Sequence, residues 1–154
     1  MGIIQIQDDF EGDHSDWFTT GRAGFDFDRG FAHSGRGNAW VRNTIGWNAI
    51  NRWFDVDPYS DCDVSAWIRM SLGLRDGYMS VRNSQEDGGG PILNEVRLLG
   101  FNTPNSDNSE YGRVSFSFNS GDNSRILFYV GLWGNNTDEW IQIDDFVLQW
   151  STPF

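Results

Sequence analysis

Hydrophobic and polar residues alternate along much of this sequence with the period of two that is typical of β-strands. In 114–118, Val114, Phe116 and Phe118 alternate with two serines, and in 64–70 and 126–132 aliphatic or aromatic residues fill every second position. Successive side chains of a strand point to opposite faces. These three segments therefore indicate which residues form a core and which face outward.

Ten segments suit β-strands, and polar turns rich in Gly, Asn, Asp and Ser separate them. They are residues 3–10, 22–28, 38–43, 47–56, 62–71, 77–83, 93–99, 111–118, 124–133 and 139–149. No segment has a convincing helical pattern, and neither a composition shift nor a repeat divides the 154 residues. We therefore predict an all-β fold, an antiparallel β-sandwich or jelly roll of about ten strands. We expect one domain that covers residues 1–154.

Aromatic rings, Arg and Asn gather at the predicted outward positions. The candidate ligand-binding residues are Trp47, Asn48, Asn51, Arg69, Tyr78, Arg82, Tyr129 and Trp133. Flat rings beside planar hydrogen-bonding groups suit a sugar, which has apolar C–H faces and a fringe of hydroxyls. Two alternatives stay open. The rings of this set could pack together as a second small core. The residues could also be divided between the two outer faces of the sandwich, because the sequence does not assign the strands to one sheet.

The charge balance narrows the classes of partner. The formal net charge is −11 and the pI is about 4.3, with eleven Arg and no Lys. This charge argues against nucleic acid and against an anionic membrane surface, both of which attract basic proteins. It is compatible with a neutral ligand or with a cation, and it can also serve only to keep the protein soluble.

No apolar run approaches the length of a membrane span, and the single cysteine, Cys62, excludes an intramolecular disulfide.

Acidic residues near both ends of the chain suggest a cation site. Asp9 and Glu11 lie at the end of the first predicted strand, and Asp144 lies on the last. If the terminal strands pair, these carboxylates meet near the tight turn that contains Ser34 and Gly37. Two or three carboxylates and a few backbone carbonyls would satisfy Ca²⁺. The alternative is a set of carboxylates that cap turns without any ion.

Four short motifs and Trp17 carry a resemblance to a known family. In chain order the motifs are Asp8-Asp9-Phe10-Glu11-Gly12, the segment 33–40 (His-Ser-Gly-Arg-Gly-Asn-Ala-Trp), the segment 64–69 (Val-Ser-Ala-Trp-Ile-Arg) and the segment 143–148 (Ile-Asp-Asp-Phe-Val-Leu). Over roughly residues 8–148 the chain resembles the carbohydrate-binding modules with a galactose-binding-like jelly roll that are attached to bacterial glycoside hydrolases. The resemblance implies non-catalytic binding of a polysaccharide or glycan by an extracellular protein. It also implies a structural Ca²⁺ held by Glu11, Asp144, carbonyls of Ser34–Gly37 and the Asp9 carbonyl. It does not transfer the position of the ligand.

Two other functions remain as alternatives. A structural or adhesive domain of a phage or cell surface would use the aromatic face to contact another protein. A small jelly-roll enzyme would need a pair of carboxylates, for which the candidates are Glu95, Glu110, Glu139 and Asp144. The two histidines, His14 and His33, fall in predicted turns, which argues against a lyase. We expect no catalysis, and either a monomer or a module of a larger secreted protein.

Overall fold

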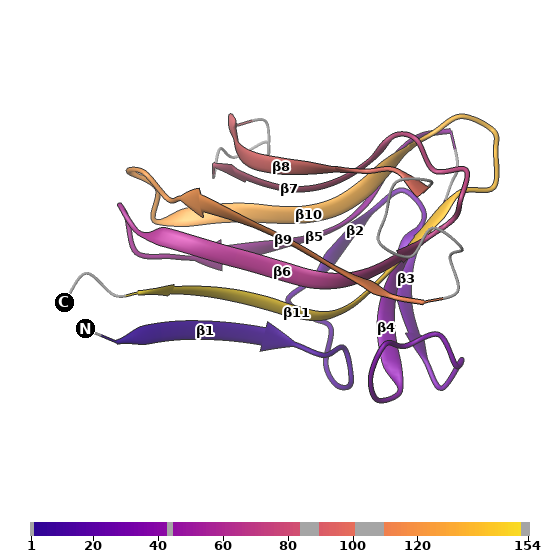
Figure 1. Ribbon diagram of the computed structural model, residues 1–154, viewed down its shortest axis with the longest axis horizontal. Helices are drawn as coiled ribbons and strands as arrows, with labels where there is room; N and C mark the ends of the chain where they lie inside the picture. Colours follow the sequence, from indigo (N-terminus) through magenta and orange to yellow (C-terminus); the bar gives the residue numbers. More distant parts are fainter. Residues whose placement is uncertain (1, 43–44, 84–89, 101–109, 152–154) are drawn as a thin grey trace.

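The fold is built from β-strands in two layers (Figure 1). The computed structural model describes residues 2–42, 45–83, 90–100 and 110–151, and this part of the chain contains eleven strands and no helix. The strands are β1 (Ile3–Asp8), β2 (Phe18–Thr20), β3 (Ala23–Phe27), β4 (Gly37–Arg42), β5 (Gly46–Asp55), β6 (Asp61–Met70), β7 (Gly77–Asn83), β8 (Ile92–Leu98), β9 (Gly112–Asn119), β10 (Arg125–Gly134) and β11 (Trp140–Ser151). None of these residues forms a helix that could span a membrane.

The strands form two antiparallel sheets. Sheet A has the order β3-β4-β11-β6-β9, and β1 pairs with the second half of β11. Sheet B has the order β2-β5-β10-β7-β8. Neighbours in both sheets are mostly distant in sequence, as in a jelly roll. The predicted antiparallel β-sandwich is confirmed.

The core lies between the sheets and follows the predicted alternation. Val64, Ala66 and Ile68 of β6 meet Ile126 and Phe128 of β10 in one cluster of buried side chains. The core also holds a group of tightly packed rings contributed by both sheets and by the segment after β1: Phe10, Trp17, Phe54, Phe128 and Phe146. Aromatic rings bury a large area each, so this group accounts for a substantial part of the apolar burial.

All ten predicted strands exist, and one strand, β2, was missed. It is only three residues long, all three are exposed, and it pairs with β5 at the edge of sheet B. An alternation cannot be recognised over three residues, so the sequence carried no usable signal for β2. Its position matters because it forms one wall of the groove described below.

One charged residue lies on the inner side of sheet B. Arg52 is paired across the sheet with Phe128, and its guanidinium lies 4.6 Å from the centre of the Phe54 ring. Its Nη1 lies 3.4 Å from the carboxylate of Asp8, which also accepts a hydrogen bond from Trp17 Nε1. The ion pair and the ring contacts compensate for partial burial of the charge.

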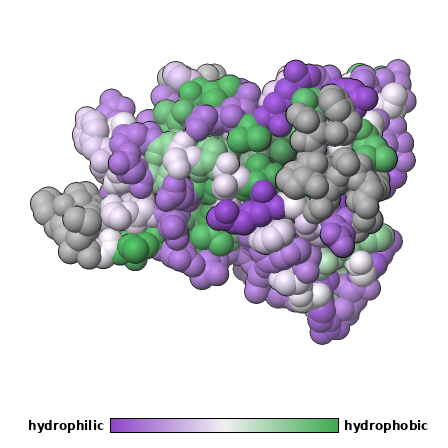
Figure 2. All heavy atoms as spheres, in the orientation of Figure 1, coloured by the Kyte–Doolittle hydropathy of each residue, from purple (hydrophilic) through white to green (hydrophobic). Residues whose placement is uncertain are grey.

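The terminal strands pair as predicted. The register runs from Ile3 opposite Ser151 to Asp8 opposite Phe146, so the described ends of the chain lie side by side (Figure 1). The chain leaves β1 at the far end of this pair, and the acidic segment 8–11 is therefore placed near the turn before β4. On the face seen in Figure 2, hydrophilic residues surround smaller groups of hydrophobic ones, in line with the high net charge.

Candidate functional site

The outer face of sheet B carries a groove of about 700 Å³. Side chains from all five strands of the sheet line it: Phe18, Thr20, Trp47, Asn51, Trp53, Tyr78, Arg82, Glu95, Leu127, Tyr129 and Trp133. Most of these positions alternate with core positions of the same strands, so the groove is a direct consequence of the strand period. Five of the lining side chains are Trp or Tyr.

Trp47 is the centre of the aromatic lining. It lies opposite Trp133 across the β5–β10 pair, and the two ring centres are 5.1 Å apart. Its ring also meets Tyr129 edge to face at 5.6 Å and Tyr78 at 6.4 Å. A side chain at Gly131 would collide with this ring, because its Cβ would lie 2.5 Å from Trp47 Cζ2. Glycine at this position therefore allows the indole to lie across β10.

Polar groups are fixed within the same groove. Arg82 Nε donates a hydrogen bond of 3.0 Å to the Tyr129 hydroxyl, and Ser80 Oγ donates one of 2.7 Å to Glu95. Asn51 Nδ2 donates to the Phe18 carbonyl and to Thr20 Oγ1, which ties β5 to β2. Side chains held in this way present their remaining donors and acceptors without a large loss of conformational entropy on binding.

The rings differ in how accessible they are. Trp133 is 55% exposed, whereas Tyr129 and Asn51 are each 5% exposed. Trp133 and the half-buried Trp47 and Tyr78 can therefore contact a ligand with their ring faces, while Tyr129 and Asn51 mainly shape the floor. The arrangement combines apolar flat surfaces with a few oriented polar groups, as binding sites for small organic molecules do.

Six of the eight predicted ligand-binding residues come together in this groove, and two do not. The six are Trp47, Asn51, Tyr78, Arg82, Tyr129 and Trp133. The placement of Asn48 on an outer face is wrong: it is buried and its Oδ1 accepts the backbone N–H of Arg22. Arg69 does face outward, but from sheet A, where its Nε donates to Gln142.

Five lining residues were not among the predicted ones. Trp53 and Leu127 share the phase of Asn51 and Tyr129, so alternation alone could have added them. Phe18 and Thr20 belong to the missed strand β2. Glu95 was considered only as a possible catalytic carboxylate, and it reaches the groove because β8 pairs with β7 at the edge of sheet B.

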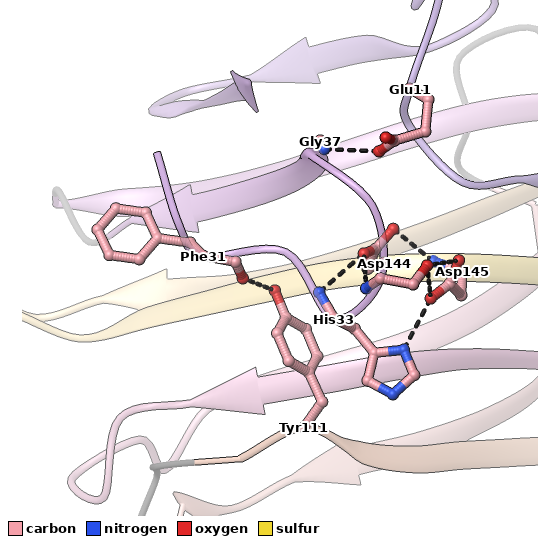
Figure 3. Close-up of polar contacts among 8 residues, drawn as sticks. Glu11, Phe31, His33, Gly37, Tyr111, Asp144 and Asp145 are labelled. Atoms are coloured by element: carbon pink, nitrogen blue, oxygen red, sulfur yellow. Dashed lines mark hydrogen bonds and ion pairs between the residues drawn. The ribbon is translucent and has the colours of Figure 1, made fainter. Parts of the chain in front are cut away.

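Glu11 and Asp144, two of the predicted metal ligands, lie at the turn of residues 33–37, as does Gly37 (Figure 3). The Glu11 carboxylate accepts the backbone N–H groups of Arg36 (2.7 Å) and Gly37 (2.6 Å). The Asp144 carboxylate accepts those of His33 (2.9 Å) and Ser34 (3.0 Å). Asp9 lies further out, and its Oδ1 accepts the backbone N–H of Glu11. Two carboxylates from distant parts of the chain thus hold one turn by its amides.

The neighbouring Asp145 completes this network. It accepts hydrogen bonds from Ser34 Oγ and contacts His33 Nδ1 at 2.7 Å, and the His33 ring stacks on Trp67 at 4.1 Å. Asp144 is fully buried, and this burial raises the pKa of its carboxyl to about 6. Hydrogen bonds from three backbone N–H groups act in the opposite direction and lower this pKa.

As arranged, these residues do not fit a Ca²⁺ ion. A cation requires six to eight oxygen atoms around one centre, whereas the oxygens of Glu11 and Asp144 face N–H donors. Among the described residues, no group of three or more His, Cys, Asp or Glu side chains is placed to hold a metal ion. The structural Ca²⁺ stays a prediction, and the geometry instead matches carboxylates that cap a turn.

Comparison with solved structures places this architecture among the β-sandwiches of carbohydrate-binding modules and adhesin domains. The CBM22-1 xylan-binding domain of Xyn10C from Paenibacillus barcinonensis superimposes with a TM-score of 0.68 at 14% identity, over 97% of this chain and 95% of that chain. TmCBM61, solved with β-1,4-galactotriose, gives 0.59 at 18% identity, over 89% of this chain and 90% of that chain.

An adhesin domain has a comparable likeness. The K1 cleaved adhesin domain of Lys-gingipain from Porphyromonas gingivalis W83 gives a TM-score of 0.67 at 11% identity, over 98% of this chain and 99% of that chain. No family model and no curated protein matches the sequence. At these identities the comparisons establish the fold, and they confirm the fold that the sequence motifs implied.

Proposed function

We propose that this protein is a non-catalytic carbohydrate-binding module whose groove on sheet B binds a polysaccharide or glycan chain. One observation carries the proposal: a groove of about 700 Å³ in which Trp47, Tyr78 and Trp133 surround fixed polar groups. Each ring that covers a sugar face removes apolar area from water. By analogy with other aromatic contacts, each such contact contributes about 0.5–1.5 kcal/mol beyond area burial.

The fold comparisons support the same proposal. Of the solved structures with this fold, one is named for xylan binding and another was solved with a β-1,4-linked galactotriose. Both are β-sandwich modules that match nearly the whole of this chain. A neutral polysaccharide for this groove also fits the net charge of −11. We extend the proposal to an extracellular location, where polysaccharides are met.

The surroundings of the candidate catalytic carboxylates favour binding without catalysis. Glu95 lies in the groove and accepts a hydrogen bond from Ser80, whereas Asp144 lies under the 33–37 turn on sheet A. Glu139 accepts a hydrogen bond from Ser71 Oγ, away from both. A glycosidase needs two carboxylates on either side of one bond. Among the described groove-lining residues, Glu95 is the one carboxylate.

The test measures how much the exposed ring of Trp133 contributes to polysaccharide binding. Affinity gels and isothermal titration with xylan, β-1,4-galactan and other neutral polysaccharides should show saturable binding by the wild type. Trp133→Ala should weaken it by about tenfold, because a ring contact of roughly 1–1.5 kcal/mol is lost. The melting temperature should change little, because Trp133 is 55% exposed.

Phe27→Ala is the matched control, since Phe27 is an exposed ring (48%) on β3 of the other sheet. It should bind like the wild type. Equal affinities of the wild type and Trp133→Ala, or no binding to any polysaccharide by a folded protein, would refute the proposal.

A protein-binding or adhesive role is the second candidate. It is favoured by the likeness to the gingipain adhesin domain and by the exposed apolar rings Trp133 and Phe18 at the groove. Aromatic rings are also enriched at protein interfaces. Light scattering distinguishes self-association through the groove from sugar binding. Two copies that bury the groove between them form a dimer, whereas a sugar-binding groove leaves the protein monomeric.

A further inference from the structure

A second depression, of about 380 Å³, lies on the outer face of sheet A, on the side of the sandwich opposite to the groove of sheet B. Its lining combines two half-buried rings, Trp40 and Trp140, with four arginines: Arg22, Arg29, Arg42 and Arg69. None of these residues takes part in the groove described above. We refer to it as the arginine depression.

The sheet register builds the floor of the arginine depression. Gly24, Trp40, Gln142 and Arg69 lie in one row across β3, β4, β11 and β6. A Cβ on Gly24 would lie 2.9 Å from Trp40 Cζ2, so the glycine leaves room for the Trp40 indole to lie against β3.

Arg69 is also held in position. Its Nε donates a hydrogen bond of 2.7 Å to Gln142 Oε1, and its guanidinium carbon lies 5.7 Å from the centre of the Trp140 ring. The same carbon lies 5.5 Å from the centre of the Tyr111 ring. The hydrogen bond to Gln142 uses one of the five guanidinium N–H donors. Because the guanidinium group is planar, the same contacts also fix the directions of its other N–H donors.

The depression is positive in a strongly negative molecule. Its four guanidinium groups are opposed by Asp26, which also lines it, and by Asp138, which pairs with Arg42 at 2.7 Å. Burial raises the pKa of the Asp26 carboxyl, and the nearby charge of Arg29 opposes this shift. The four guanidinium groups nevertheless outnumber the two carboxylates. Arg22 and Arg29 form no ion pair with any described residue. Four of the eleven basic residues of a chain with net charge −11 therefore face one small area.

We propose that the arginine depression binds the carboxylate of a uronic acid, as a second saccharide site independent of the groove on sheet B. Guanidinium groups match a carboxylate with two parallel hydrogen bonds. Trp40 and Trp140 supply the flat apolar faces that a pyranose ring covers. A neutral sugar would leave the excess positive charge of the arginines uncompensated, whereas the carboxylate of an acidic sugar compensates it.

The experiment compares glucuronosyl-xylotriose with xylotriose, two ligands that differ by one uronic acid. Titration calorimetry of the wild type should give about tenfold tighter binding of the acidic ligand, because charge-assisted hydrogen bonds are added. Added NaCl should reduce this difference. In two-dimensional NMR spectra, the acidic ligand should shift the indole N–H signals of Trp40 and Trp140.

Two variants locate the site. The double variant Arg22→Gln/Arg29→Gln replaces two exposed side chains, so it should fold normally and lose the preference for the acidic ligand. Trp133→Ala alters only the groove on sheet B and should keep that preference. Binding of xylotriose itself tests the groove on sheet B, so failure of one site can be told from failure of the other.

Three results would overturn the second site: equal affinity for the two ligands, an unchanged preference in the double variant, or loss of the preference in Trp133→Ala. A xylotriose bearing sulfate instead of glucuronate serves as a further probe. Tighter binding of this sulfated ligand would show that the depression selects sulfate and would refute the uronic acid as its ligand.

Discussion

Single residues decide the shape of the groove on sheet B. Gly131 lies between Ala49 and Tyr78 in one row across the sheet, and the Trp47 indole occupies the space that a larger residue at this position would need. Small residues in the middle of two strands thus leave room for this indole on an otherwise aromatic surface. Strand glycines often mark such a close approach of a neighbouring group.

Gly131→Ala should therefore damage both stability and binding. Its Cβ would lie 2.5 Å from Trp47 Cζ2 and 2.7 Å from the Asn48 carbonyl oxygen, and the backbone cannot move as easily as the ring. We expect a loss of roughly 1–3 kcal/mol in the free energy of unfolding, typical of overpacking. Displacement of Trp47 should also weaken polysaccharide binding. Chemical denaturation and calorimetry measure the two effects.

Gly12→Ala is the control for this variant, because no atom of a residue beyond its two chain neighbours lies within 4 Å of the added Cβ. Wild-type stability and affinity in Gly131→Ala would mean that Trp47 adopts another position at no cost. In that case the indole would not be part of a preformed binding surface.

At the residue scale, the sequence predicted the facing of most site residues but not of Asn48. Strand β5 carries Trp47, Ala49 and Asn51 on one side and Asn48, Ile50 and Arg52 on the other. Both sides mix polar and apolar residues, since Arg52 is stabilised inside by Asp8 and by aromatic rings. Alternation cannot give the phase of such a strand, and only the partners across the sheet define it.

At the scale of elements, the 33–37 turn depends on two carboxylates from distant strands. Glu11 follows β1 and Asp144 lies on β11, and together they accept four backbone N–H groups of the turn. Hydrogen bonds to a charged acceptor stabilise a structure more than hydrogen bonds between neutral groups do. The turn thereby fixes β4 next to the β1–β11 pair.

Glu11→Ala should lower the free energy of unfolding by about 1–3 kcal/mol, because two backbone donors lose their acceptor. The loss should be the same in excess Ca²⁺ and in excess chelator, since the observed contacts are hydrogen bonds. Thermal melts under both conditions measure it. Asp122→Ala, which removes an exposed carboxylate in another turn, should melt like the wild type.

A wild-type melting temperature that falls in chelator would contradict this account. It would instead support the structural Ca²⁺ that the family resemblance implies. The same melts therefore test the capping geometry and the ion together.

The order of strands in the two sheets could not be obtained from the sequence. Ten strands were predicted from their alternation, and their bounds differ from the observed ones by a few residues. However, β6 and β7 are neighbours in the chain and belong to different sheets. Arg69 and Tyr78 therefore face opposite sides of the molecule, although both lie on the outside. Non-local pairing, which no local pattern encodes, separates them.

At the scale of the whole molecule, charge is unevenly distributed over the two outer faces. The groove on sheet B contains one arginine, Arg82, and one carboxylate, Glu95, among its described lining residues. The arginine depression on sheet A has an excess of guanidinium groups. Salt screens charge–charge attraction but has little influence on ring stacking.

Binding of a neutral polysaccharide should therefore change less than about twofold between low and high NaCl concentrations, because no ion pair with the ligand is screened. Affinity gels run at several salt concentrations measure this. Double-stranded DNA serves as the control polyanion and should not bind, given the net charge of −11. A steep decrease of neutral polysaccharide affinity with salt would contradict a groove that binds mainly by ring contacts.

The pairing of β1 with β11 also determines how the protein responds to mechanical load. Ile3 and Ser151 are partners at one end of this antiparallel pair, so a force that separates the two ends acts at right angles to the strands. The hydrogen bonds of the pair lie along that force and break one after another, as in a zipper, rather than all together as in shear. Strand β1 would peel away first, up to Asp8 and its contacts with Trp17 and Arg52. Neither the groove nor the arginine depression is lined by β1, so both binding surfaces lie outside the part of the fold that yields first.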